Sequence, residues 1–211
     1  MFTEVFSEFA SLKAATWISL AALLALAAIL VLCRKKWDTR MLTYGAMCIA
    51  LSFILSYIRL YRMPQGGSIT PGSMLPMMLY AYAFGPSAGI AAGVVYGLLQ
   101  LLQDFYVMHP VSLIMDYILA FAMLGFAGFA KRHLAAGALL AGAGRWLWHF
   151  LSGFIFYGMY AWEGWNPVAY SAVYNAIVIG PDLLICVGIA CIPAIDRLAN
   201  NLKAKLHPAR S

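Results

Sequence analysis

The sequence is poor in charge. Only 10% of its 211 residues are Asp, Glu, Lys or Arg, whereas 64% are hydrophobic. A soluble domain carries about 25% charged and about 45–50% apolar residues. The composition therefore excludes an ordinary soluble domain and predicts a polytopic membrane protein. At about 20 residues per spanning helix, the chain has room for six or seven spans and for no sizeable soluble domain.

Motifs of ATPases and of zinc metalloproteases are missing as well. No segment resembles a Walker A loop, so any ATP chemistry must belong to another subunit. HExxH is absent, and the four cysteines form no CxxC pair, which argues against a zinc site or a disulfide framework. We therefore predict no enzyme activity, catalytic residue, metal or cofactor. An intramembrane enzyme that uses Asp116 with His149, or Cys186, stays an alternative.

Long uncharged runs mark the expected spans. Gly85-Pro86-Ser87 is a turn signal that divides the longest run into two helices. The first run is followed, not preceded, by positive charges, which favours a retained helix over a cleaved signal peptide. We predict an all-α membrane protein with seven spans, in the runs 14–33, 41–58, 63–103 (two helices), 110–130, 134–160 and 168–195.

The basic residues set the expected orientation in the plasma membrane. Cytoplasmic loops of membrane proteins are rich in Lys and Arg. With the 34–40 loop in the cytoplasm, the N-terminus lies outside and the C-terminus inside. Ten of the fourteen basic residues then face the cytoplasm: 34, 35, 36, 40, 131, 132, 197, 203, 205 and 210. The net charge of +6 therefore records topology and does not indicate nucleic-acid binding.

Polar side chains inside the spans are costly in lipid and are functional by default. At 1.5 Å per residue, Asp116, His149 and Asn175 lie roughly 9, 13 and 10 Å below the outer ends of three helices. Their common depth favours one pocket over three unrelated hydrogen bonds. A carboxylate beside stacked aromatic faces suits a small heteroaromatic cation. The phenols that the sequence places nearby are Tyr117, Tyr157, Tyr170 and Tyr174.

A second pair of charges lies deeper in the last two spans. Arg145 and Asp182 are each about thirteen or fourteen residues from the outer ends of their helices. An unpaired charge at that depth would be expensive, so a mutually neutralising ion pair is the simplest account. We assign this pair a structural role.

Small residues recur at helical spacing in two of the spans. Glycine occurs every four residues from Gly85 to Gly97, which lets helix backbones approach closely. Tight packing within the chain is the expected use, with a dimer interface as the alternative. Ala46 and Ala50 are also four residues apart, and either a buried seam or a docking face for another membrane helix explains them.

Four stretches of the chain resemble signature stretches of one family. They are MPQGGSITPGSMLP, GPSAGIAAGVVYGLLQ, HPVSLIMDYILAF and HFLSGFIFYGMYAWEGWNPVAYSAVYN. In combination they are similar to the thiamine-specific S-components (ThiT, also YuaJ) of energy-coupling factor transporters. The resemblance implies a six-helix S-component core that captures thiamine from outside with high affinity. It also implies a transmembrane coupling subunit and ATP-hydrolysing subunits as partners.

The resemblance also implies roles for individual residues. Asp116 matches the acidic residue that holds the aminopyrimidine, and Tyr157 stands where a relative has Trp. Ala46 to Ala50 match the alanine motif through which S-components dock on the coupling subunit. The positions that match vitamin-contacting residues are Asp116, Tyr117, His149, Tyr157, Tyr170 and Asn175.

The chain departs from the family pattern in two places. A family member has Trp and Glu in the loop after the first helix, whereas this chain has Met63-Pro64-Gln65-Gly66-Gly67-Ser68, so Gln65 or Ser68 is expected to line the site. The run at 14–33 adds a span ahead of the core. The expected division is an extra N-terminal transmembrane helix at 1–36, the six-helix core at 37–198 and a cytoplasmic basic tail at 199–211.

Two alternatives share the predicted fold but differ in ligand. The same transport role could serve a thiamine precursor such as hydroxymethylpyrimidine, or another small vitamin. A scaffold that binds no ligand predicts instead that loss of the Asp116 carboxylate leaves vitamin uptake untouched.

Overall fold

The computed structural model describes residues 37–206 and, before them, Trp17, Ala21, Leu24 and Ala28. The predicted first span at 14–33 therefore lies outside the described residues, except for these four helical positions. Most of the described chain is helical, and a two-stranded antiparallel hairpin is its only sheet.

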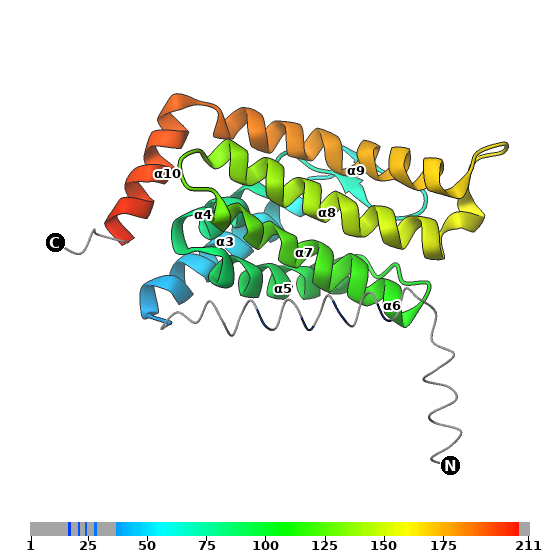
Figure 1. The fold of residues 1–211 in the computed structure, drawn as a ribbon, viewed down its shortest axis with the longest axis horizontal. Coiled ribbons are helices and arrows are strands. Elements are labelled where there is room, and N and C mark those ends of the chain that lie inside the picture. Colours follow the sequence, from blue (N-terminus) through cyan, green and yellow to red (C-terminus); the bar gives the residue numbers. More distant parts are fainter. Residues whose placement is uncertain (1–16, 18–20, 22–23, 25–27, 29–36, 207–211) are drawn as a thin grey trace, which may run out of the picture.

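The elements follow one another with short connections (Figure 1). The first half comprises α3 (Thr39–Tyr57), β1 (Tyr61–Arg62), β2 (Ser68–Ile69), α4 (Leu75–Phe84) and α5 (Pro86–Gln103). One continuous helical segment, 110–129, comes next and comprises α6 (Pro110–Leu113), a π-helical stretch (Ile114–Leu119), α7 (Ala120–Ala122) and a 3-10 stretch (Met123–Phe129). The last part comprises α8 (Leu134–Phe156), a 3-10 turn (Gly158–Tyr160), α9 (Pro167–Ala190) and α10 (Pro193–Leu206).

Six helical segments confirm the predicted six-helix core. Within the described residues, α3, α5, the 110–129 segment and α9 are long and apolar enough to cross a membrane. Helix α8 has 23 residues, about 34 Å at 1.5 Å per residue, although it carries Arg145 and His149. Helix α4 has only 10 residues, about 15 Å, which is half the thickness of the hydrocarbon core.

Two boundaries of the predicted spans are wrong. The break at Gly85-Pro86 is confirmed, but residues 63–74 of the 63–103 run form most of the hairpin and a turn before α4. Gly66, Gly67 and Gly72 have positive φ there, which a helix cannot accommodate. The last span ends at Ala190 and not at 195. Pro193 lacks a backbone donor and instead begins α10 as its first residue.

The glycine ladder packs α5 against the 110–129 segment. A Cβ added at Gly93 would lie 2.4 Å from the carbonyl oxygen of Phe121, and one at Gly97 would lie 1.8 Å from that of Tyr117. Any larger side chain would push the two backbones apart. The predicted close packing within the chain is therefore confirmed, and it fixes the backbone around Asp116 relative to α5.

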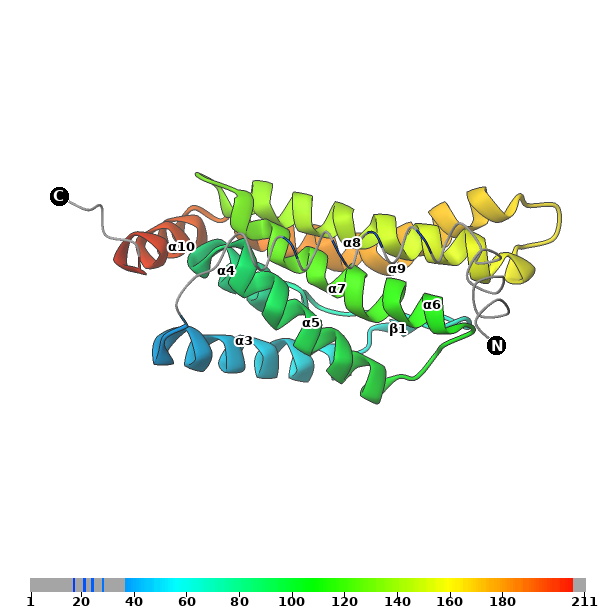
Figure 2. The same ribbon diagram turned by 60° about the horizontal axis from the view of Figure 1, so that its bottom comes forward.

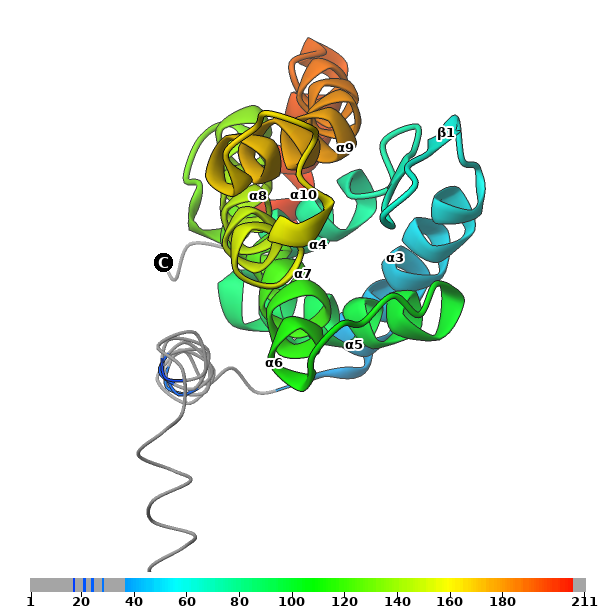
Figure 3. The same cartoon turned by 90° about the vertical axis from the view of Figure 1, so that its right-hand side faces the viewer.

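The helices form two groups with the hairpin between them. Figures 1 and 2 show α8 and α9 running side by side, with α3 and α5 on the other side of the bundle. Seen along the bundle in Figure 3, β1 and β2 lie between α3 and α9. The hairpin therefore fills the space between α3 and α9, with β1 exposed and β2 half-buried, and its two strands pair their backbones with each other.

Helix α10 crosses one end of the bundle and was not predicted as a helix. Its Ala199 is fully buried, its Asn200 bonds the Tyr82 hydroxyl of α4, and Lys203 Nζ donates to Ala130 O at 2.7 Å. The expected boundary between core and tail at 198/199 falls inside this helix. The first half of the predicted tail thus packs against the core.

Candidate functional site

A cavity of about 170 Å³ lies between the two groups of helices. The hairpin, α5, the 110–129 segment, α8 and α9 all contribute to its lining. The structure brings together every residue for which the sequence predicts a ligand contact: Asp116, Tyr117, His149, Tyr157, Tyr170 and Asn175. Within the described ranges, no three His, Cys, Asp or Glu side chains converge as metal ligands.

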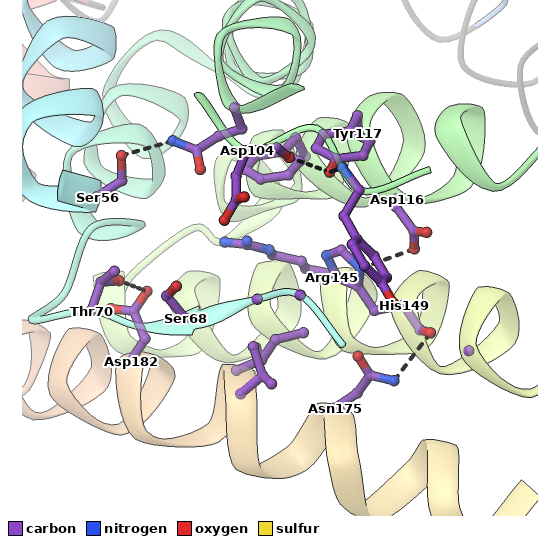
Figure 4. Close-up of a pocket in the computed structure, with 18 of the residues that line it drawn as sticks. Ser56, Ser68, Thr70, Asp104, Asp116, Tyr117, Arg145, His149, Asn175 and Asp182 are labelled. Atoms are coloured by element: carbon purple, nitrogen blue, oxygen red, sulfur yellow. Dashed lines mark hydrogen bonds and ion pairs between the residues drawn. The ribbon is translucent and has the colours of Figure 1, made fainter. Parts of the chain in front are cut away.

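The Asp116 carboxylate is held by two side chains of α8. Its Oδ1 lies 3.0 Å from His149 Nδ1 (Figure 4), and its Oδ2 accepts a 2.7 Å hydrogen bond from Ser152 Oγ. Asp116 lies in the π-helical stretch, a local widening that occurs often at functional sites. The sequence analysis placed phenols near Asp116 and did not identify Ser152, because nothing in the sequence pattern sets this serine apart.

Asn175 lies on the same side of the cavity and bonds across to α8. Its Nδ2 donates to His149 O at 3.2 Å and to Ser171 O at 2.9 Å. No described residue donates to its Oδ1, so this oxygen is free to accept from a ligand. The close approach of α8 and α9 depends on Gly153, where a Cβ would lie 2.2 Å from Ser171 Oγ.

Tyrosines form the aromatic wall. The rings of Tyr106 and Tyr157 are stacked at 5.7 Å with an interplanar angle of 18°, and Tyr157 donates to Tyr106 O at 3.3 Å. The ring centroids of Tyr170 and Tyr174 are 5.4 Å apart. Burial raises the pKa of Tyr106 to about 12, so this loop phenol is neutral at physiological pH. The sequence analysis did not identify Tyr106 as a cavity residue, because it lies outside the predicted spans.

The remaining predicted phenol, Tyr117, faces the loop after α5. Its hydroxyl donates to Asp104 O at 2.7 Å and accepts from Tyr106 N at 3.2 Å. These two bonds fix the loop that carries Tyr106. Tyr117 therefore lines the cavity and also positions part of the aromatic wall.

The hairpin closes one side of the cavity. Tyr174 on α9 accepts from Gln65 N at 3.1 Å and donates to Gly66 O at 2.9 Å, which pins the hairpin turn to the helix. At the base of the hairpin, Arg62 forms a 2.8 Å ion pair with Asp104. Gln65 and Ser68 both line the cavity, as predicted from the loop sequence.

The predicted ion pair between Arg145 and Asp182 is wrong. Both side chains line the cavity, but none of their nitrogen–oxygen distances is within 4.0 Å. Asp182 Oδ2 accepts instead from Thr70 at 2.9 Å and Ser73 at 3.1 Å, and the Arg145 guanidinium lies 4.3 Å above the Phe121 ring. The sequence assigned 63–74 to a helix, so it could not show that hydroxyls from this segment reach Asp182.

Ala46 and Ala50 lie outside the cavity. Both are exposed on α3, beside exposed apolar side chains such as Met47 and Ile54. Among the described residues Ala46 and Ala50 form no buried seam, which contradicts one of the two readings of this pattern. The face is available to lipid or to another membrane helix.

Comparisons with known proteins agree on one family. The family model described as "Thiamine transporter protein (Thia_YuaJ)" matches residues 42–201. The thiamine transporter ThiT of Bacillus subtilis (strain 168) is 32% identical over 147 residues, covering 62% of this chain and 76% of that protein. ThiT of Lacticaseibacillus paracasei is 28% identical over 122 residues, covering 48% of this chain and 61% of that protein. A solved structure of ThiT from Listeria monocytogenes superimposes with a TM-score of 0.66 at 28% identity, covering 80% of this chain and 98% of that one.

Proposed function

The chain belongs to the thiamine transporter protein family (Thia_YuaJ), and from this premise we propose that it is the thiamine-binding subunit of an energy-coupling factor transporter. The observation that carries the proposal is the cavity, where Asp116, His149 and Asn175 share a wall and tyrosines form its neighbours. In this proposal the protein captures thiamine from outside and delivers it inward when it is docked on an ATP-driven module.

The chemistry of thiamine suits this arrangement. The aminopyrimidine carries an exocyclic amine that can donate to Asp116, and ring nitrogens that can accept from a neighbouring N–H. The free Oδ1 of Asn175 supplies a second acceptor. The thiazolium ring is a permanent cation, and stacked aromatic faces attract a cation by about 0.5–2 kcal/mol, depending on desolvation. Tyr157 and Tyr170 are the predicted stacking partners.

The transport cycle requires other subunits. The sequence has no Walker A motif, so ATP hydrolysis is assigned to separate subunits. The exposed Ala46 and Ala50 on α3 let a partner helix approach the backbone closely, and they are the proposed docking face for the coupling subunit. In this proposal the N-terminus lies outside and the C-terminus in the cytoplasm, and the whole subunit topples in the membrane to release thiamine.

Titration of the purified full-length protein tests the ligand. The rings of Trp162 and Tyr170 are 5.1 Å apart, so binding at Tyr170 should change the intrinsic tryptophan fluorescence. Thiamine is expected to bind more tightly than hydroxymethylpyrimidine, because the free pyrimidine lacks the thiazolium cation. Equal binding of the pyrimidine would favour the precursor as ligand, and no response to thiamine would overturn the proposal. Release of a chemically altered ligand by the protein alone would revive the enzyme alternative.

A further inference from the structure

Basic side chains gather at one end of the bundle, away from the cavity. Figures 1 and 2 show that α3 and α8 begin at this end and that α10 lies across it. Four basic residues are exposed there and lie outside the cavity lining, in the first turn of α3, in the turn before α8 and on α10: Arg40, Lys131, Arg132 and Arg197.

The carboxylates described at this end cap helices and do not neutralise the basic residues. Asp38 Oδ1 accepts from Met41 N at 2.7 Å, which caps the start of α3. Asp196 Oδ1, from α10, accepts from Leu134 N at 2.9 Å, at the start of α8. Among the described residues, no carboxylate oxygen lies within 4.0 Å of a side-chain nitrogen of the four basic residues. This end of the bundle therefore carries positive charge that the described chain leaves unpaired.

Contacts of α10 with the turn before α8 hold three of these charges close together. Lys203 Nζ donates to Ala130 O at 2.7 Å, and Asn200 Nδ2 donates to Arg132 O at 3.2 Å. Arg197 precedes Asn200 by about one helical turn, so it lies next to the segment that carries Lys131 and Arg132. The fold thus gathers basic residues from two segments that are far apart in the sequence.

Large apolar side chains accompany the charges. Each exposed basic position has one within three residues of it in the sequence, and these side chains are also exposed: Trp37, Phe129 and Leu198. Basic residues beside exposed apolar or aromatic side chains are typical of segments at the boundary between lipid tails and headgroups. A soluble anion or a nucleic acid needs no such apolar contact, so the pattern favours a lipid as the partner.

We propose that Lys131, Arg132 and Arg197 form a binding surface for the headgroups of anionic phospholipids. Charge-assisted hydrogen bonds from Lys and Arg to phosphate oxygens are among the strong ones. Each Lys or Arg near an anionic membrane surface adds about 5-fold to the association. In the orientation proposed above, the surface faces the cytoplasmic leaflet. The inference does not depend on the identity of the transported ligand.

Native mass spectrometry of the purified full-length protein tests this surface. The protein, in a neutral detergent, is mixed with equal amounts of phosphatidylglycerol and phosphatidylcholine that have identical acyl chains, and the lipid adducts of each kind are compared. The wild-type protein is expected to retain phosphatidylglycerol at least about 10-fold more than phosphatidylcholine, since three basic residues contribute. In the triple variant Lys131→Gln, Arg132→Gln and Arg197→Gln, this preference should fall toward one.

The matched control keeps the charges and exchanges the side chains, with Lys131→Arg, Arg132→Lys and Arg197→Lys in one chain. It should keep the wild-type preference. The single variant Arg132→Gln guards against loss of the fold in the triple variant, because the Arg132 side chain is exposed and makes no hydrogen bond among the described residues. It should lose about 5-fold of the preference.

Three results would overturn the proposal. The first is equal retention of the two lipids by the wild-type protein, and the second is a preference that survives in the triple Gln variant. The third is displacement of phosphatidylglycerol by millimolar inorganic phosphate, which would show a site for a free anion. If the lipids were retained equally and the triple Gln variant bound thiamine but failed to support uptake, the surface would be assigned to a protein partner instead.

Discussion

His149 Nδ1 lies 3.0 Å from Asp116 Oδ1, so an imidazole on α8 and a carboxylate on the neighbouring segment meet inside the membrane-spanning core. Ser152, one turn along α8, holds the other carboxylate oxygen at 2.7 Å. Both contacts come from one face of α8, so the carboxylate is oriented before any ligand arrives. Pre-orientation of this kind reduces the entropy that binding must lose.

Replacing Asp116 by Asn should weaken thiamine binding strongly. The substitution keeps the shape but removes the charge and turns one acceptor into a donor that faces His149 or the ligand amine. The expected loss is about 1–3 kcal/mol, or roughly 5- to 150-fold in Kd. Fluorescence titration measures it, and Ser152→Ala, which keeps the charge, should cost less. Unchanged affinity in Asp116→Asn would place the ligand elsewhere.

Removing the Tyr174 hydroxyl should loosen the hairpin. In Tyr174→Phe, Gln65 N and Gly66 O lose their bonds to α9 while the ring stays in the aromatic wall. Each bond contributes about 0.5–1.5 kcal/mol, so thiamine should dissociate several-fold faster in stopped-flow measurements. Tyr44→Phe is the control, since Tyr44 is exposed on α3 and lies outside the cavity lining. Identical dissociation rates in the two variants would show that the hairpin does not limit release.

Gly97→Ala should destabilise the fold. The new methyl group would lie 1.8 Å from Tyr117 O, a backbone atom that cannot move without shifting the 110–129 segment. Overpacking costs about 1–3 kcal/mol. Thermal unfolding in detergent should show a lower midpoint than for Gly188→Ala, where the methyl group meets nothing within 4 Å. Equal midpoints would mean that α5 is not closely packed there.

Ala46→Trp should separate binding from transport. Ala46 is exposed on α3 and outside the cavity, so thiamine titration of the purified variant should match the wild type. Uptake by cells should be abolished, because the bulky ring keeps a partner helix away. Leu184→Trp, at an exposed position of α9, is the control for a bulky ring in lipid. Equal losses of binding and uptake in Ala46→Trp would contradict separate faces for the two roles.

Much of the site was accessible from sequence, for a simple reason. Polar residues in apolar helices are rare, and their depth follows from a fixed rise per residue. Asp116, His149 and Asn175 could therefore be placed in one layer without knowing which helices are neighbours. The non-helical contributors could not be found in this way, because Tyr106 and the hairpin belong to segments without periodicity.

Hydropathy and backbone chemistry act locally, so the sequence was enough to predict the membrane class, the layer of polar ligand candidates and the break at Gly85-Pro86. The six-helix core was implied by the family resemblance. The hydrogen-bond partners of the buried charged side chains could be read only from the tertiary structure. In the folded chain Asp182 accepts hydrogen bonds from Thr70 and Ser73, and Arg145 has no hydrogen bond among the described residues. A charge can be expected to find a partner, but which partner it finds depends on a turn that brings residues 109 and 112 positions apart into contact. In place of the expected ion pair, Arg145 and Asp182 therefore have separate contacts in the lining of one cavity.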